Sequence, residues 1–412
     1  MGAVIGLQCP KCGRASSSRT IFRCADCHSV LQVKLRINQL TPADFAAMRA
    51  RRDRSIWRWF DFFPVEQRSS IVSLGEGGTP LIRAATLGEH LDLRNLHLKN
   101  DTVLPTGSLK DRSNSVGISV AKELGFDTVA VMSTGNAAAS VAAYAAAAQM
   151  RSVVMMPAGT ARSKIMQTGA YGATVVLVQG SFDAELASLY RAAVREFGWY
   201  DCLSSNPYRV GKKSYAYELA DQLEGSPDWV IHPSSGGAGI PCIWEGFREL
   251  AELGWINRVP KLVAAQSALA APIVAAFESG AEEVAPVIAR QTVAESIQVG
   301  DPAALGWRTL HALRDSGGSA VAATEEEILA AQSLTARLTG VFAEPAGAIS
   351  VAAAKKLRAA GLIGPDEVVV CNITGHGLKQ PEAIAAAENR FAAIAPTLAA
   401  LRERLCEADW TL

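Results

Sequence analysis

The sequence carries no excess charge of either sign, because its 40 lysines and arginines balance its 40 aspartates and glutamates. Proteins that bind nucleic acid show a basic excess or a basic stripe, so this balance argues against a nucleic-acid partner. Long hydrophobic runs are also lacking. The most apolar stretch, AAASVAAYAAAA at 137–148, is shorter than the roughly 20 apolar residues of a membrane span, so we expect no membrane partner. With 49% hydrophobic residues in a chain of 412, there is still enough apolar material for the cores of two domains.

A targeting signal is not visible in the first residues either. MGAVIGLQCPKCG lacks a basic region followed by an apolar one, and a myristoylation signal would need Ser or Thr where Gly6 stands. We therefore expect a cytoplasmic protein. Cysteine is sparse, and four of its eight occurrences fall within the first 27 residues. In a reducing compartment, that distribution favours a metal site over disulfides.

The early cysteines form two Cys-x-x-Cys pairs separated by eleven residues: Cys9, Cys12, Cys24 and Cys27. Each pair can present two thiolates to one tetrahedral ion, and four thiolates match a closed structural zinc site. Free thiols are the alternative. The pattern predicts a zinc-ribbon-like knuckle over residues 1–35.

A charged and aromatic connector follows at 36–72 and includes the stretch RARRDRSIWRWFDFFP. Its basic run is brief and acidic residues follow it. We therefore expect a solvated helix that packs its aromatic side chains onto the main body, rather than a binding patch. These side chains are Trp57, Trp59 and Phe60.

Apolar strands and helical patterns alternate through the rest of the chain. A first set has strand-like runs at 128–134, 152–156 and 174–180, and a second set has them at 228–233, 261–266 and 367–374, with helical spacing between the runs. Such alternation predicts an α/β fold with two open parallel sheets covered by helices. We expect a small domain at 109–205 and a large domain made of 73–108 and 206–412.

Two polar segments stand where a turn or a strand meets a helix. PTGSLKDR at 105–112 holds Lys110 behind a stiff turn. HPSSGGAGIP at 232–241 offers backbone N–H groups and a helix N-terminus that suit one phosphate, and it matches neither the nucleoside-triphosphate nor the dinucleotide motif. A tight turn without a ligand is the alternative. A single-phosphate loop and a fixed lysine are what a pyridoxal phosphate enzyme needs, because the lysine amine forms a Schiff base with the cofactor.

The chain resembles the threonine synthase family of fold-type-II pyridoxal phosphate enzymes over about residues 50–385. The motifs match those of the family in order and spacing as well as in residue identity. The early cysteine knuckle is also similar to one on many family members. The matching stretches are SLGEGGTPLI (73–82), PTGSLKDR (105–112), STGNAAASVAAYAA (133–146), NPYRVGKKSYAYEL (206–219), HPSSGGAGI (232–240), EPAGAISVA (344–352) and TGHGLKQP (374–381).

The resemblance implies that Lys110 is the catalytic residue and the Schiff-base lysine. It implies that Asn136 bonds the 3-hydroxyl of pyridoxal 5'-phosphate and that Thr374 offers a neutral hydroxyl to the pyridine nitrogen. The cofactor phosphate is then held by the backbone of Gly236, Gly237, Ala238 and Gly239. Substrate contacts are implied for Ser108, Ser133, Thr134 and Arg209, although Arg209 fits a structural ion pair as well. The family habit also implies a homodimer.

The implied reaction converts the amino acid O-phosphohomoserine and water to threonine and phosphate by γ-elimination and β-addition. Departures from the family pattern lie near the reacting centre: Ala137 replaces a threonine, Leu109 replaces a phenylalanine, and SGGAGI stands where Gly-Asn-Ala-Gly-Asn is common. A second hypothesis is therefore β-replacement or β-elimination on a serine or threonine derivative, as in a cysteate synthase acting on O-phosphoserine or in a dehydratase. A third is a non-catalytic relative that binds a partner through its knuckle.

Overall fold

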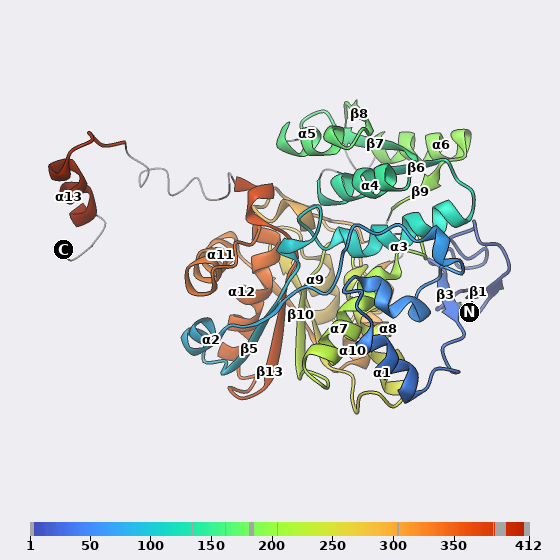
Figure 1. Ribbon diagram of the computed structural model, residues 1–412, viewed down its shortest axis with the longest axis horizontal. Helices are drawn as coiled ribbons and strands as arrows, with labels where there is room; N and C mark the ends of the chain where they lie inside the picture. The colour runs from blue at the N-terminus through green and yellow to red at the C-terminus, as the bar shows by residue number, and fades with distance from the viewer. Residues whose placement is uncertain are drawn as a thin grey trace. The chain divides into compact units, whose positions relative to one another are not determined.

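The computed structural model describes residues 4–133, 135–160, 162–180, 185–203, 205–302, 305–381, 383 and 393–407. Residues 1–379 form one compact unit, shown from blue to orange-red in Figure 1. Residues 380–412 form a second unit, which contains α13 (Leu398–Glu407) and is described only by itself.

The knuckle region is a small antiparallel sheet of strand order β2-β1-β3. Its strands are β1 (Val4–Gln8), β2 (Ala15–Ser16) and β3 (Gln32–Leu35). One Cys-x-x-Cys pair lies in the loop between β1 and β2, and the other lies between β2 and β3. The two loops therefore bring the pairs together at one end of this sheet.

The connector holds three short helices: α1 (Pro42–Ala50), η1 (Ile56–Phe62) and η2 (Arg68–Ser70). Trp57, Trp59 and Phe60 are at most 3% exposed. The Nε1 of Trp57 also donates a 2.9 Å hydrogen bond to Oγ of Ser115 in the main body. The prediction that these aromatic residues pack inward is confirmed. The prediction that the helix carrying them is solvated is wrong, because every residue of η1 except Asp61 is buried.

A four-stranded parallel sheet of order β8-β7-β6-β9 forms the upper part of Figure 1. Its strands are β6 (Thr128–Met132), β7 (Arg151–Pro157), β8 (Thr174–Val178) and β9 (Tyr200–Asp201). The accompanying helices are α3 (Lys110–Glu123), α4 (Asn136–Ala147), α5 (Arg162–Ala170) and α6 (Ala187–Phe197). The three predicted strands are confirmed to within a few residues, whereas β9, at two residues, is too short to show a periodic pattern.

The larger sheet has six strands in the order β12-β11-β10-β13-β5-β4. These are β4 (Leu81–Arg83), β5 (Asn95–Asn100), β10 (Trp229–Pro233), β11 (Lys261–Ser267), β12 (Ser319–Ala323) and β13 (Val368–Ile373). The three predicted strands, β10, β11 and β13, run parallel as expected, and β5 and β12, which the sequence analysis missed, are parallel to them. The edge strand β4 is antiparallel to β5. This edge corrects the expectation of a purely parallel sheet, since a short segment can turn back beside β5 without a crossover.

The helices of this part are α2 (Ala85–Leu91), α7 (Ser214–Gln222), α8 (Gly239–Glu252), α9 (Pro272–Glu278), α10 (Gly306–Asp315), α11 (Glu325–Thr339) and α12 (Pro345–Ala359). Single turns of 3₁₀ helix join them: η3 (Asp101–Val103), η5 (Val210–Lys213), η6 (Glu295–Ile297) and η8 (Gly377–Lys379). Strands β4 and β5 precede the four-stranded sheet along the chain but lie in the six-stranded one. The domain boundaries given from the sequence stay a prediction.

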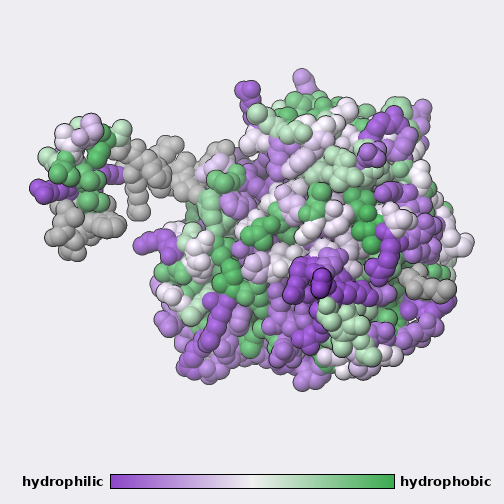
Figure 2. Space-filling model, viewed as in Figure 1, coloured by the Kyte–Doolittle hydropathy of each residue, from purple (hydrophilic) through white to green (hydrophobic). Residues whose placement is uncertain are grey.

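Hydrophilic and hydrophobic residues are interspersed over the face of residues 4–379 seen in Figure 2, without a broad apolar area. Among the described residues, none of the helices has both the length and the apolar character needed to cross a bilayer.

Candidate active site

The turn before α3 fixes the position of Lys110. The carboxylate of Asp111 accepts hydrogen bonds from the backbone N–H (2.8 Å) and the hydroxyl (2.6 Å) of Thr106, which closes the turn. Gly107 has φ +76°, in the left-handed region that favours glycine. The N–H of Leu109 donates to the carbonyl oxygen of Thr374 at 2.9 Å, so the start of α3 is tied to the end of β13. Lys110, the first residue of α3, is therefore held rigidly.

A buried network anchors the same turn of α3 from the other side. The guanidinium of Arg112 donates to both carboxylate oxygens of Asp101 at 2.8 Å and to Glu218 at 2.6 Å, and all three side chains are almost fully buried. It also lies over the ring of Tyr215 at 4.3 Å. This network joins η3, α3 and α7, and the sequence did not reveal it because its members are far apart along the chain.

The pKa of Lys110 lies well below its ordinary value of 10.5, at about 8. Burial is the main cause, because the protein interior solvates an ammonium group poorly, and the charge of Arg209 lowers the pKa further. The carboxylate of Glu344 acts in the opposite direction. A lysine whose pKa lies near neutral can act as a nucleophile and as a base.

Lys110 lines a small cavity of about 50 Å³. The cavity brings together Lys110, Ser133 and Asn136, three of the site residues predicted from the sequence. Its other described lining residues are Gly135, Ala137, Lys164, Ser296 and Glu344. Ala137 therefore faces the same space as the lysine, at the position where a family member commonly has a threonine.

Glu344 is a cavity residue that sequence reasoning missed. Both of its carboxylate oxygens accept 3.0 Å hydrogen bonds from the side-chain amide nitrogen of Asn136, and Oε1 accepts another from Ser296. Asn136 is thus already bonded, so a ligand hydroxyl at this amide would have to share it with the carboxylate. The signal in the sequence was the acidic residue of EPAGAIS, directly before the proline that begins α12.

The backbone around Ser108 is joined to the backbone around Thr374. Ser108 forms an isolated β-bridge with Gly375, the neighbour of Thr374, and both side chains are buried. The hydroxyl of Ser108 has no hydrogen-bond partner among the described residues. A buried hydroxyl without a partner is unfavourable unless a ligand or water supplies one.

The glycine loop lies between β10 and α8, as predicted. Gly237 has φ +86°, and a Cβ there would lie 2.3 Å from Oγ1 of Thr309. A Cβ on Gly239, the first residue of α8, would lie 2.2 Å from Nε2 of His232. No side chain caps this helix, so the loop can present its backbone N–H groups. Within the described residues, however, this loop is not part of the lining of the small cavity.

Arg209 packs against α3, and Thr134 lies outside the described residues. The Cγ of Arg209 is 3.0 Å from the place of a Cβ on Gly117, and its Nε is buried without a hydrogen-bond partner in the described part of the chain. Burial lowers its pKa, while Asp201 and Cys202 oppose that change. The structural ion pair considered from the sequence is not found among the described residues.

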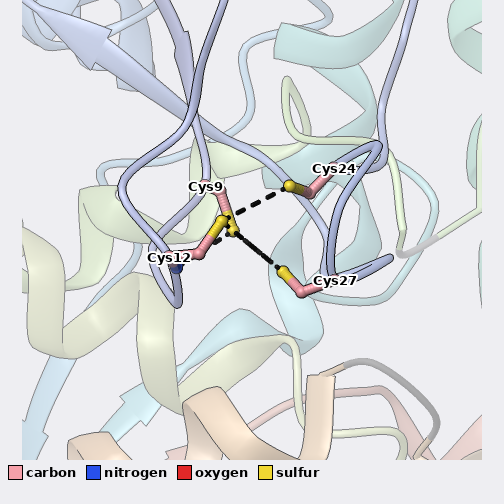
Figure 3. Close-up of side chains that lie close together, drawn as sticks. All are labelled: Cys9, Cys12, Cys24 and Cys27. Carbon is pink, nitrogen blue, oxygen red and sulfur yellow. Dashed lines mark hydrogen bonds between the residues drawn. The ribbon is translucent and has the colours of Figure 1, made fainter.

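The four early cysteines converge on one point, as Figure 3 shows. Their Sγ atoms all lie within 4.8 Å of one another. The Sγ–Sγ distances are 3.4 Å for Cys9–Cys27, 3.5 Å for Cys12–Cys24 and 3.8 Å for Cys12–Cys27. A tetrahedron with Zn–S bonds of about 2.3 Å has edges of about 3.8 Å, so this cluster could hold a metal ion.

Comparison with known proteins identifies the family of this chain. Residues 72–375 match a family described as "Pyridoxal-phosphate dependent enzyme". The threonine synthase of Methanocaldococcus jannaschii is 40% identical over 379 residues, covering 91% of this chain and 93% of that protein. The threonine synthase of Methanosarcina acetivorans is 39% identical over 388 residues, with 92% and 93% covered.

Solved structures share the fold at lower identity. Threonine deaminase isoform 2 from Solanum lycopersicum superposes with a TM-score of 0.63 at 22% identity, covering 75% of this chain and 88% of that one. Maize serine racemase gives 0.64 at 20% identity, covering 76% and 92%. The predicted fold class, that of fold-type-II pyridoxal phosphate enzymes, is confirmed.

Proposed function

This chain belongs to the family of pyridoxal-phosphate dependent enzymes, and we propose that it is a threonine synthase, which converts O-phosphohomoserine and water into threonine and phosphate. The observation that carries the proposal is the placement of Lys110, held at the start of α3 and lining a cavity with Ser133 and Asn136. Relatives named threonine synthase match over more than nine-tenths of both chains, which supports the same activity.

The residues around Lys110 fit the cofactor of the family. Among the described residues, the buried hydroxyl of Ser108 has no hydrogen-bond partner and no side chain caps α8, so a phosphate-bearing ligand can accept hydrogen bonds from both. The loop before α8 has no room for a Cβ at Gly237 or Gly239, which leaves its backbone N–H groups free of side-chain cover. We assign Lys110 to its aldehyde, Asn136 to its 3-hydroxyl and Thr374 to its pyridine nitrogen. We assign its phosphate to the backbone of Gly236, Gly237, Ala238 and Gly239.

Pyridoxal phosphate, when bound, supplies an electron sink for the substrate's Cα. Lys110 takes the proton from Cα and moves protons at Cβ, which its lowered pKa permits near neutral pH. The Cγ–O bond breaks with its electron pair on the departing phosphate, and a proton matching the one taken from Cβ is added at Cγ, which becomes a methyl group. The oxygen of water bonds to Cβ, Cα recovers its proton, and the proton that water loses is balanced by the one that the released phosphate takes up. We assign the charged groups of the substrate to Arg209, with help from Ser108, Ser133 and Thr134.

Product analysis tests this proposal. The purified protein, incubated with O-phosphohomoserine, is expected to release phosphate and threonine in equal amounts, and Lys110→Ala should release neither. Borohydride reduction of the cofactor-loaded protein should attach the label at Lys110. Ammonia and a 2-oxo acid without threonine would refute the assignment.

A second candidate keeps the cofactor and changes the reaction. Ala137 lines the cavity and offers no hydroxyl, which favours a substrate other than O-phosphohomoserine. The candidate reactions are β-replacement on O-phosphoserine with sulfite and β-elimination on serine or threonine. The same assay with these amino acids separates them, because cysteate or ammonia would replace threonine as the product.

Three further assignments belong to this proposal. The Cys9, Cys12, Cys24 and Cys27 cluster supports a structural zinc ion, and the family supports a homodimer and a cytoplasmic location for the small-molecule chemistry. A non-catalytic binding module would instead be a colourless protein whose partner affinity is confined to residues 1–35. The absorption spectrum of the purified protein separates that reading from an enzyme.

A further inference from the structure

The short helix η5 is wedged between α3 and α8. A Cβ added to Gly211 would lie 1.7 Å from the carbonyl oxygen of Arg112 in α3. A Cβ added to Gly246 of α8 would lie 2.8 Å from the carbonyl oxygen of Lys213. These close approaches hold the backbone of η5 against both helices, so the two lysines that end it have fixed positions.

The two lysines have different surroundings. The ammonium group of Lys213 pairs with Glu249, and Glu249 also accepts a hydrogen bond from Tyr217 at 2.5 Å. Lys212 is only 7% exposed, yet among the described residues no carboxylate pairs with it and no group accepts a hydrogen bond from it. An ammonium group on a side chain this little exposed is poorly solvated, and in proteins such groups are usually paired or bound to a ligand.

Lys212 lies beside the first turn of α8. Its electrostatic neighbours are Lys110, Arg209 and Cys242, and Cys242 belongs to that first turn. Burial and the two cations lower the pKa of Lys212 to about 7. Lys212 is also the strongest charged neighbour of His232, whose ring fills the space next to Gly239.

A bound anion would offset the repulsion between Lys212 and the neighbouring cations Lys110 and Arg209. Ammonium groups and helix N-termini both bind phosphate, and a dianion can accept from each at once. In the glycine loop, Gly237 has no side chain and that of Ile240 is apolar, so neither residue offers a side-chain donor. The charge of Lys212 acts on Cys242 in the first turn of α8, so its ammonium group is a donor available to this turn.

We propose that Lys212 is a phosphate-binding residue, whose ammonium group and the first-turn N–H groups of α8 together bind a phosphate monoester next to Lys110. Naming the ligand rests on the proposed function, because both the cofactor and O-phosphohomoserine are phosphate monoesters. The binding chemistry is the same for either source.

The test compares Lys212→Met with Lys213→Met, which removes the neighbouring charge that already has a carboxylate partner. Affinities for pyridoxal 5'-phosphate and for pyridoxal are measured on the cofactor-free protein by quenching of tryptophan fluorescence. On the cofactor-loaded protein, KM for O-phosphohomoserine and inhibition by inorganic phosphate are measured. These arms separate the cofactor's phosphate from the substrate's.

If Lys212 binds the cofactor's phosphate, Lys212→Met weakens pyridoxal 5'-phosphate binding roughly tenfold or more and leaves pyridoxal unchanged. If it binds the substrate's phosphate, both of these affinities stay the same. In that case KM rises by a similar factor, and inorganic phosphate inhibits less. Equal losses for the two pyridoxal forms, or values that match Lys213→Met in every arm, would overturn the proposal.

Failure of this inference can be told from failure of the proposed function. If the wild type makes threonine and Lys212→Met behaves like it in every measurement, only the role of Lys212 is refuted. If the wild type makes no threonine but Lys212→Met still loses the preference for the phosphorylated ligand, only the proposed reaction is refuted. If Lys212→Met does not fold, Lys212→Gln should lose that preference and Lys212→Arg should keep it.

Discussion

Replacing Lys110 with methionine should stabilise the cofactor-free protein at pH 7. The folded chain holds this amine in surroundings that lower its pKa from 10.5 to about 8. At 1.36 kcal/mol per pKa unit, the charged form costs the folded state about 3 kcal/mol. Methionine has a similar length and no charge, so it removes that cost.

The pH dependence gives the sign of the effect. Between pH 8 and 10.5 the unfolded chain binds more protons at this position than the folded chain does, so the free energy of unfolding of the wild type rises with pH. The advantage of Lys110→Met is therefore full below pH 8. It should shrink from about 3 kcal/mol at pH 7 to about 1 kcal/mol at pH 9.5.

Thermal unfolding of the cofactor-free proteins at the two pH values measures this difference. Lys122→Met is the control, because Lys122 is an exposed residue in the last turn of the same helix, and its substitution should change Tm equally at both pH values. The reasoning is refuted if Lys110→Met is less stable than the wild type at pH 7. It is also refuted if its advantage is the same at pH 9.5.

Three other perturbations follow from the contacts. Arg112→Met leaves Asp101 buried without its cation and leaves Glu218 paired with Lys99 alone. It should cost about 3–5 kcal/mol, seen as a large fall in Tm, whereas the exposed Arg195→Met should change Tm little. Glu344→Gln removes the carboxylate that raises the pKa of Lys110, so the pH midpoint for binding pyridoxal 5'-phosphate should move down; an unchanged midpoint would contradict the contact. Metal analysis should find about one zinc ion per chain in the wild type and in Cys242→Ala and none in Cys9→Ser, and a chelator should lower Tm.

The sequence was sufficient for the parts of the fold that depend on local pattern. Strands such as β6 and β10 are continuous apolar runs, and their alternation with helical spacing predicted two parallel sheets. Lys110 and the glycine loop were visible because a turn and small residues break that pattern. The antiparallel direction of β4 was not visible, because pairing direction is set by the neighbouring strand rather than by the three residues of β4.

The contacts that tune the site lie beyond local pattern. Asn136 and Glu344 are 208 residues apart, and the Arg112 network joins three separate segments. The two adjacent lysines of η5 are the clearest case, since the sequence does not show that Lys213 pairs with Glu249 whereas Lys212 has no partner within the described part of the chain. Such differences arise only when distant helices pack around one short turn.

The charges around Lys110 also connect stability with ligand binding. The charge of Arg209 lowers the pKa of both Lys110 and Lys212, and the charge of Lys110 lowers the pKa of Lys212 further. Among the described residues, Glu344 is the carboxylate that acts on Lys110. Like charges gathered in the interior destabilise the folded protein while it holds no ligand, because each ammonium loses water without gaining a counterion. A phosphate monoester supplies that counterion and binds only the folded state. At a concentration of 100 Kd it should add about 2.7 kcal/mol to the free energy of unfolding. Ligand binding therefore offsets the stability that the folded protein loses by gathering these charges. If this coupling holds, phosphate ligands should raise the Tm of the wild type, and they should raise the Tm of Lys212→Met by less.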